Sequence, residues 1–345
     1  MTLLKVKDLQ TVFHTPRGRV DAVNNVSFSV ESGEVVGVVG ESGSGKSVLA
    51  KSIMRLIDAP GEIRSGDIIL NGESLLKKTE SEMQSIRGGA VSMIFQDPMN
   101  SMNPTITVGE QIAEAVRLHQ EIGESTTFSS EMKRKILGTV ENSKSWQRAI
   151  EMLETVQIPD PESRAKSYPH EFSGGMLQRA MIAMALSCEP DLLIADEPTT
   201  ALDVTIQAQI LEEINNLIEE FNTSIILITH NLPVVAEVCN RVNVMYAGEI
   251  VEKANTRELI QNPQHPYTQG LLRSVPRLEG ENQALTPIPG DVPELIDIPY
   301  ACSFAPRCPE ATERCLSKEP EFIEIDRGHY AACLEREGAG KKDNY

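Results

Sequence analysis

The chain has 345 residues, which is long enough to bury a full core and to form two or three folded units. Acidic residues number 50 against 32 basic ones, giving a formal net charge of −18, and this argues against nucleic acid or anionic lipid as the main partner. The sequence has no long apolar window and no signal peptide, so we expect a cytosolic protein that does not itself cross a membrane. In that setting, six cysteines are expected to be free thiols or metal ligands.

Residues 3–39 alternate between apolar and polar side chains, and turn residues at 15–18 and 31–34 interrupt them. This pattern predicts an antiparallel β layer. Phe13 falls at the end of its first strand, where an aromatic ring could stack on a purine. A plain core or edge position is the alternative for this side chain.

A glycine-rich loop follows the β-branched run at 34–39, which predicts a buried strand, and apolar residues recur after it at helical spacing. Residues 40–47 fit the pattern G-x-x-x-x-G-K-[ST], whose backbone N–H groups wrap nucleotide phosphates. The loop would thus join a strand to a helix N-terminus, where orphan N–H groups favour an anion. A glycine-rich turn without a ligand is the alternative.

Two further strands are predicted at 66–72, ending in an Asn-Gly turn, and at 90–95. Gln96 stands at the carboxyl end of the second, a place where a polar side chain can meet a ligand, although it is often only a strand exit. From 107 to 188 the pattern is helical, apart from a polar stretch at 123–145. Ser173, Gly174 and Gly175 open its last long helix, and they can cap it while leaving N–H groups for an external phosphate.

The apolar run at 191–195 predicts another buried strand, and it delivers two adjacent carboxylates, Asp196 and Glu197, to its carboxyl end. An aspartate there can hold phosphate-bound magnesium through water, and a glutamate can deprotonate an attacking water. A turn at 198–203 leads into a helix predicted to run to about residue 220. The next strand, at 224–229, ends at His230, which could donate to a terminal phosphate or simply occupy a turn.

Four of the six cysteines lie within the last part of the chain, in a proline-rich tail that we expect to wrap rather than to form a new core. Cys302, Cys308, Cys315 and Cys333 have the spacing C-x5-C-x6-C-x17-C. Thiols gathered in this way suggest a metal centre, either zinc or iron–sulfur. Structural zinc sites usually carry C-x2-C pairs, and this run has none. Zinc and empty thiols remain alternatives.

Taken in order, six of these motifs resemble the nucleotide-binding subunit of ABC transporters, over residues 3 to about 250. Residues 96–104, the signature at 172–179 and the segment His265-Pro266-Tyr267-Thr268 are similar to dipeptide and oligopeptide permease ATPases of the D type. The resemblance implies an α/β fold: a P-loop NTPase core with an antiparallel β layer, an inserted helical subdomain and a loop-rich, cysteine-containing extension. The implied boundaries are 1–96 with 189–255 for the core, 97–188 for the helical subdomain and 256–345 for the extension.

The resemblance also implies roles for individual residues in Mg²⁺-dependent ATP hydrolysis. Glu197 would be the general base, with His230, Gln96 and Lys46 as further catalytic groups. Ser47, Gln96 and Asp196 would hold Mg²⁺. Contacts to ATP would come from Phe13, Gly40, Glu41, Ser42, Gly43, Ser44, Gly45, Lys46, Ser47, Val48, Gln96, Asp196, Glu197, His230 and Asp203, and Ser173, Gly174 and Gly175 would contact the nucleotide of a partner subunit. Related permease ATPases carry a [4Fe–4S] cluster in the extension, which implies Cys302, Cys308, Cys315 and Cys333 as its ligands.

The implied assembly is a peptide importer at the cytoplasmic face of the membrane. Its parts would be a second ATPase subunit, packed head to tail as a heterodimer, two membrane-spanning permease subunits and, indirectly, a peptide-binding protein. Three alternatives are a soluble ABC ATPase acting on ribosomes or DNA, an importer of another small solute such as nickel, and an iron–sulfur-sensing regulatory module without turnover. Against the first, the chain has one cassette, no heptads and a negative net charge.

Overall fold

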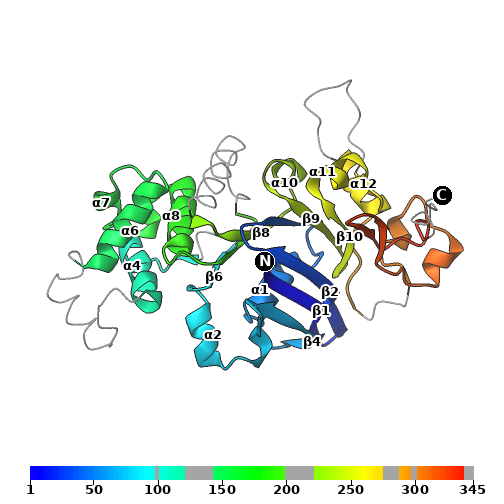
Figure 1. The fold of residues 1–345 in the computed structure, drawn as a ribbon, viewed down its shortest axis with the longest axis horizontal. Helices are drawn as coiled ribbons and strands as arrows, with labels where there is room; N and C mark the ends of the chain where they lie inside the picture. The colour runs from blue at the N-terminus through cyan, green and yellow to red at the C-terminus, as the bar shows by residue number, and fades with distance from the viewer. Residues whose placement is uncertain (98–100, 121–142, 199–220, 275–286, 297–300, 338–345) are drawn as a thin grey trace, which may run out of the picture. The chain divides into compact units, whose positions relative to one another are not determined.

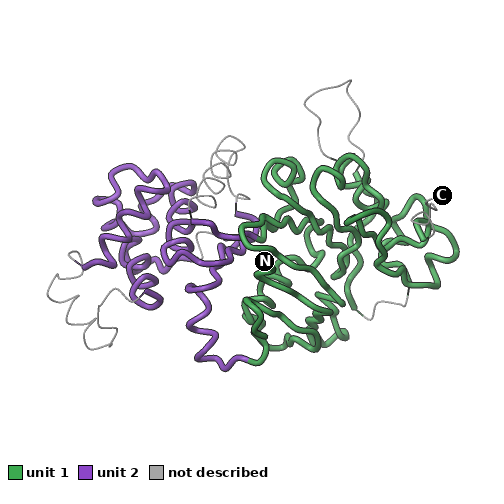
Figure 2. Tube along the Cα trace, viewed as in Figure 1, with its two compact units in different colours: residues 1–77, 226–345 green, residues 78–225 purple. Residues whose placement is uncertain are grey.

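The computed structural model describes residues 1–97, 101–120, 143–198, 221–274, 287–296 and 301–337. The chain divides into two compact units (Figure 2). Unit 1 comprises residues 1–77 and 226–345, and unit 2 comprises residues 78–225. Asp203, the helix expected after it and most of the polar stretch at 123–145 lie outside the described residues.

The predicted antiparallel layer is confirmed in unit 1, where four strands pair in the order β2, β1, β4, β5 (Figure 1). Leu4 and Val6 of the first strand are buried, as the alternation requires, and a register shift between Val6 and Leu9 accompanies the burial of Leu9. Asn71 and Gly72 form the tight turn between the last two strands, with φ values of 50° and 83° that suit a two-residue hairpin. The strand bounds are β1 Thr2–Thr15, β2 Gly18–Glu31, β4 Gly61–Leu70 and β5 Glu73–Ser74.

A second set of strands in unit 1 lies in the order β11, β12, β10, β9, β3, β8. β3 runs parallel to β9, whereas β9, β10, β12 and β11 pair antiparallel. Every residue of β3 and of β8 is buried, which explains their continuous apolar sequences. The bounds are β3 Val35–Val39, β8 Ser224–Thr229, β9 Arg241–Tyr246, β10 Glu249–Asn255, β11 Ile323–Asp326 and β12 His329–Ala331.

Short helices connect these strands. The bounds in unit 1 are α1 Lys46–Ile53, α10 Leu232–Val238, α11 Thr256–Gln261 and α12 Pro266–Arg273, with 3-10 turns η1 Leu75–Lys77, η4 Ala305–Arg307 and η5 Glu313–Leu316. No helix in the described part of the chain is both long and apolar enough to span a membrane.

Unit 2 combines a parallel strand pair, β6 Val91–Ile94 and β7 Leu192–Asp196, with a helical part. Helices α4, α6 and α8 pack against one another (Figure 1). Ser143 accepts a hydrogen bond from the Trp146 N–H and caps α6, so the helix begins one residue before the predicted end of the polar stretch at Ser145. The helices are α2 Glu80–Ile86, α4 Val108–His119, α6 Lys144–Thr155, α7 Pro161–Arg164 and α8 Gly174–Leu186, with the 3-10 turn η3 Pro169–Glu171.

The cysteine-containing tail forms two short strands that its proline-rich sequence does not predict. β12 pairs with β10, so the tail adds β12 and β11 to the strands of unit 1. His329 of β12 contacts the fully buried Glu252 of β10 through Nε2 and Oε1, 2.7 Å apart. Glu252 also accepts the backbone N–H groups of Gln264 and His265. The tail is thereby tied to the sheet by hydrogen bonds to one buried carboxylate.

Candidate functional site

The glycine-rich loop lies between β3 and α1, as the sequence predicts. A Cβ on Gly40 would lie 2.2 Å from the carbonyl oxygen of Met245, and one on Gly45 would lie 2.2 Å from that of Ala22. Gly45 also has a φ of 100°, a backbone conformation that residues with side chains rarely adopt. Glycine is required at both positions because the neighbouring backbone lies too close to leave room for a side chain.

Lys46, the first residue of α1, turns its ammonium group back into this loop. Its Nζ donates to the carbonyl oxygens of Gly40 and Glu41, 2.8 Å from each, and lies 3.4 Å from Ser44 Oγ. The side chain is almost wholly buried, with 5% of the residue exposed. A cation enclosed by a loop at a helix N-terminus is the arrangement that binds phosphate.

Two other predicted residues belong to unit 1. Phe13 of β1 pairs with Gly61 of β4, and its half-buried ring lies directly over that glycine, where an added Cβ would be 2.5 Å from the ring. His230 follows β8 and is exposed. Asn231 next to it donates its N–H to Thr229 Oγ1 at 3.0 Å, which shapes the turn that carries the histidine.

The carboxylates lie at the end of β7 in unit 2. Asp196 is the last residue of the strand and is 3% exposed, whereas Glu197 is half-buried. Glu197 has a φ of 48°, in the left-handed region, and a non-glycine residue there stores about 1–3 kcal/mol of strain.

Gln96, which follows β6, meets Glu197. Its Nε2 donates to Glu197 Oε2 at 3.2 Å. Both strands are parallel neighbours, so the residues that follow them reach the same edge. The structure therefore brings together two residues that are about 100 positions apart in the sequence.

The predicted cap of α8 is also present. Ser173 Oγ accepts the N–H of Met176 at 3.3 Å. Gly174 is exposed, and a Cβ built on it would meet no atom within 4 Å in the described part of the chain. The N-terminus of this 13-residue helix is thus unobstructed by its own unit.

The four cysteines of the tail line one small cavity, although they are separated by up to 31 positions. Cys302 packs against the buried cluster of Ala305, Cys315 and Leu334, and the Cys302 N–H donates to the Cys315 carbonyl oxygen at 3.0 Å. Among the described residues, no group of three or more His, Cys, Asp or Glu side chains is arranged to hold a metal ion. The predicted [4Fe–4S] ligation therefore stays a prediction.

The surroundings of these thiols combine burial with backbone donors. Burial raises the pKa of Cys302 to about 11 and also raises the pKa values of Cys308 and Cys333. Hydrogen bonds from backbone N–H groups act in the opposite direction at each of the three sulfurs, and the donors are Phe304, Ala305, Glu310, Glu335 and Arg336. Such donors stabilise thiolates, the form in which cysteine binds metal.

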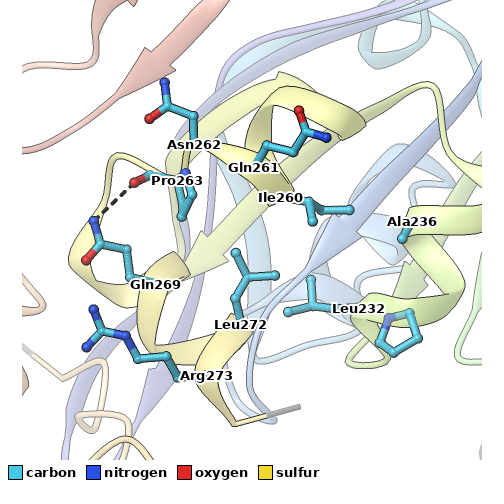
Figure 3. Close-up of a pocket in the computed structure, with 10 residues that line it drawn as sticks. Leu232, Ala236, Ile260, Gln261, Asn262, Pro263, Gln269, Leu272 and Arg273 are labelled. Carbon is cyan, nitrogen blue, oxygen red and sulfur yellow. Dashed lines mark hydrogen bonds between the residues drawn. The ribbon is translucent and has the colours of Figure 1, made fainter. Parts of the chain in front are cut away.

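A larger cavity, of about 580 Å³, lies among α10, α11 and α12 (Figure 3). The apolar side chains of Leu232, Ile260 and Leu272 line it together with polar residues from α11 and α12. Gln269 on its wall donates to the Pro263 carbonyl oxygen at 3.1 Å. None of the residues predicted for ATP or metal binding lines this cavity, so its size does not mark the functional site.

Two residues that contact the loop, Tyr267 and Arg307, have no role predicted from the sequence. Tyr267 accepts the Glu41 N–H, and Arg307 forms an ion pair with the Glu41 side chain. Each lies more than 220 positions from Glu41, so no local pattern predicts these contacts.

Comparisons with known proteins agree with this geometry. Residues 23–200 match the ABC transporter family, and residues 251–315 match the family described as oligopeptide/dipeptide transporter, C-terminal region. The ATP-binding cassette MJ0796, solved as a dimer in a post-hydrolysis state with ADP and Pi, has the same fold. It is 24% identical, with a TM-score of 0.62 over 74% of this chain and 99% of that one.

Relatives with greater sequence identity are peptide transport proteins. The oligopeptide transport ATP-binding protein OppD of Escherichia coli is 48% identical, over 96% of this chain and 93% of its own. AppD of Bacillus subtilis is 48% identical over 98% of both chains, and the dipeptide transport ATP-binding protein DppD of Escherichia coli is 47% identical over 96% of both. The predicted cassette fold and the resemblance are confirmed. The chain belongs to the ABC transporter family, among its oligopeptide and dipeptide transport ATP-binding proteins.

Proposed function

We propose that this chain is the ATP-binding and ATP-hydrolysing subunit of an ABC importer for di- and oligopeptides. The observation that carries the proposal is the phosphate loop, in which the buried Lys46 ammonium lies inside the turn between β3 and α1. The nearly full-length similarity to peptide transport ATP-binding proteins supports peptides as the transported solute.

We assign the chemistry to the residues predicted from the sequence. Lys46 and the loop amides bind the β- and γ-phosphates, and Phe13 stacks on adenine. Ser47, Gln96 and Asp196 hold Mg²⁺ through their oxygen atoms, the ligands that this ion prefers. Glu197 removes the proton of the attacking water while His230 steadies the γ-phosphate. The hydrogen bond from Gln96 supports the role of Glu197, because it orients the carboxylate.

We propose that each ATP is enclosed between two subunits packed head to tail. Ser173, Gly174 and Gly175 would bind the partner's nucleotide, and Asp203 would contact ATP. The open, capped N-terminus of α8 supports this assignment, since its N–H groups can reach an external phosphate. ATP would then close the pair of subunits, and hydrolysis would release it. The pairing is proposed as a heterodimer with a second ATPase subunit.

The remaining partners are two membrane-spanning permease subunits and, through them, a peptide-binding protein. We place the chain at the cytoplasmic face of the membrane, held there by the permease subunits. Residues 97–188 would be the helical subdomain that meets these subunits, with Gln96 at its joint to the core formed by 1–96 and 189–255. Residues 256–345 would be the peptide-permease extension.

We also propose that Cys302, Cys308, Cys315 and Cys333 bind a [4Fe–4S] cluster. The four side chains are not arranged as a metal site in this structure, and the proposal is supported by their location around one cavity and by the backbone hydrogen bonds at three of the sulfurs. When bound, the cluster would supply four iron–thiolate bonds that fasten a tail with little core of its own. Zinc remains the alternative metal.

The native complex provides the test of the function. Isolation from membranes should recover this chain with a second ATPase subunit and two permease subunits. Mg²⁺-dependent ATP hydrolysis by that complex should rise when a peptide-loaded binding protein is added. Recovery with ribosomes would favour the soluble ABC ATPase, stimulation by nickel instead of peptides would favour the other importer, and a complex without phosphate release would favour the regulatory module.

A further inference from the structure

The extension reaches the phosphate loop through one side chain. Arg307, next to Cys308, forms a two-pronged ion pair with Glu41, the second residue of the loop. Arg307 Nη1 lies 2.8 Å from Glu41 Oε2, and Nη2 lies 3.0 Å from Oε1. The arginine side chain is 5% exposed and the glutamate side chain 30% exposed. Paired N–H donors of this kind fix the orientation of a carboxylate as well as its charge.

Arg307 is itself held in place on its other sides. Its Nε donates to the Pro289 carbonyl oxygen at 2.8 Å, and its guanidinium lies 5.8 Å from the centre of the Tyr246 ring. Tyr246, Tyr267 and Phe304 pack together, with ring centres 4.6 to 5.4 Å apart. The guanidinium is therefore positioned by the extension and by β9 before any nucleotide binds.

Glu41 is fixed at three points. Its carboxylate meets Arg307, its N–H donates to Tyr267 Oη at 2.8 Å, and its carbonyl oxygen accepts from Lys46 Nζ at 2.8 Å. The same residue thus connects the extension to the lysine of the phosphate loop. Any movement of Glu41 would change the position of the carbonyl oxygen that receives the Lys46 ammonium.

The charge of Glu41 matters as well. A carboxylate in a loop that binds phosphates repels the negative charge of ATP, most strongly where water is partly excluded. Arg307 neutralises this charge at hydrogen-bonding distance.

We infer that Arg307 is a positioning residue for ATP binding: it fixes Glu41, and through Glu41 the phosphate loop, and it cancels a charge that would oppose the triphosphate. The inference rests on the proposed function, because it concerns the affinity of the same loop for ATP. It gives the extension a role at the nucleotide site that does not depend on a metal.

The test is Mg²⁺-ATP binding to the folded full-length chain, measured by calorimetry for the wild type and for Arg307→Met. Loss of a hydrogen-bonded charge pair predicts that the dissociation constant rises by about tenfold. In the Glu41→Gln background the same Arg307→Met change should raise the dissociation constant by about twofold or less, because the carboxylate is gone. Arg307→Lys keeps the charge but loses the paired donors, so it should raise the dissociation constant less than Arg307→Met does. Arg307→Lys replaces Arg307→Met in the test if the latter variant does not fold.

Arg241→Met is the matched control. Arg241 also contacts a glutamate, Glu34, through two nitrogen atoms, but outside the loop. This change should lower the thermal midpoint without altering ATP affinity. Equal losses in the Arg241 and Arg307 variants, equal effects of Arg307→Met in both backgrounds, or unchanged affinity in folded Arg307 variants would each overturn the inference. A folded wild type that binds no ATP would instead refute the proposed function, and the inference with it.

In the complex, the same variants should raise the KM for ATP while kcat at saturating ATP stays within about twofold. A residue that only supports the fold would lower the amount of active protein and leave KM unchanged. Lower kcat with an unchanged KM would therefore also contradict the inference.

Discussion

Gln96 Nε2 donates a hydrogen bond to Glu197 Oε2 at 3.2 Å, and Glu197 holds a left-handed backbone conformation with φ 48°. The contact joins the ends of two parallel strands, β6 and β7. An amide that donates through nitrogen to a carboxylate keeps its oxygen for another ligand, such as Mg²⁺. One glutamine can therefore serve both the metal and the base proposed for ATP hydrolysis.

Changing Glu197 to Gln should separate ATP binding from hydrolysis. The amide is similar in size and can still contact Gln96, but it cannot accept the proton of the attacking water. Phosphate release by the complex should fall by about 100-fold or more, while the dissociation constant of ATP stays near the wild-type value. Radiolabelled ATP retained by the variant complex, together with a phosphate-release assay, measures both quantities. Normal turnover would remove Glu197 from its proposed role.

A change at Gly174 should test the shared site. A Cβ at this position meets no atom of the described residues within 4 Å, so Gly174→Asp should fold normally and bind ATP in isolation. In the paired subunits the new carboxylate would face the partner's phosphates, and hydrolysis should fall on the order of 100-fold. Gly174→Ala adds only a methyl group and is the uncharged control. Equal activity of the Gly174→Asp variant and the wild type would show that the N-terminus of α8 does not lie near a nucleotide.

Much of this architecture could be predicted from the sequence, because its signals are local. The buried strands β3, β7 and β8 are continuous apolar runs, and the capped start of α8 is a serine followed by two glycines. The pairing of β12 with β10 was not predicted, since its three residues carry no strand pattern of their own. The ion pair between Arg307 and Glu41 likewise depends on packing over 266 positions, which no local spacing encodes.

The visible absorbance of the protein should show which metal group the four cysteines of the tail bind. Protein purified without oxygen should be brown and carry about four iron atoms per chain, and Cys308→Ser should remove the visible absorbance. Cys239→Ala is the matched control, because this buried cysteine packs against Gly37 and does not line the cavity. A colourless wild type containing one zinc per chain would contradict the cluster and favour the alternative metal.

Glu249 should make stability depend on pH. Burial raises its pKa from 4.5 to about 7, while a hydrogen bond from Asn24 Nδ2 at 2.7 Å acts in the opposite direction. Because the pKa of Glu249 is higher in the folded chain than in the unfolded chain, its favourable contribution to the free energy of unfolding is complete below pH 4.5. This contribution is lost as the pH rises through 7. At pH 8 the folded chain carries a poorly solvated carboxylate.

Glu249→Gln should therefore stabilise the protein, and more so at high pH. The amide resembles the protonated carboxyl and can still accept from Asn24. The gain in the free energy of unfolding should increase by about 1–2 kcal/mol between pH 5.5 and pH 8. Thermal midpoints of the wild type and the variant at the two pH values measure this difference. Glu313→Gln, at an exposed position, should shift the midpoint equally little at both pH values. A gain from Glu249→Gln that does not increase between pH 5.5 and pH 8 would show that folding does not raise the pKa of this carboxyl group.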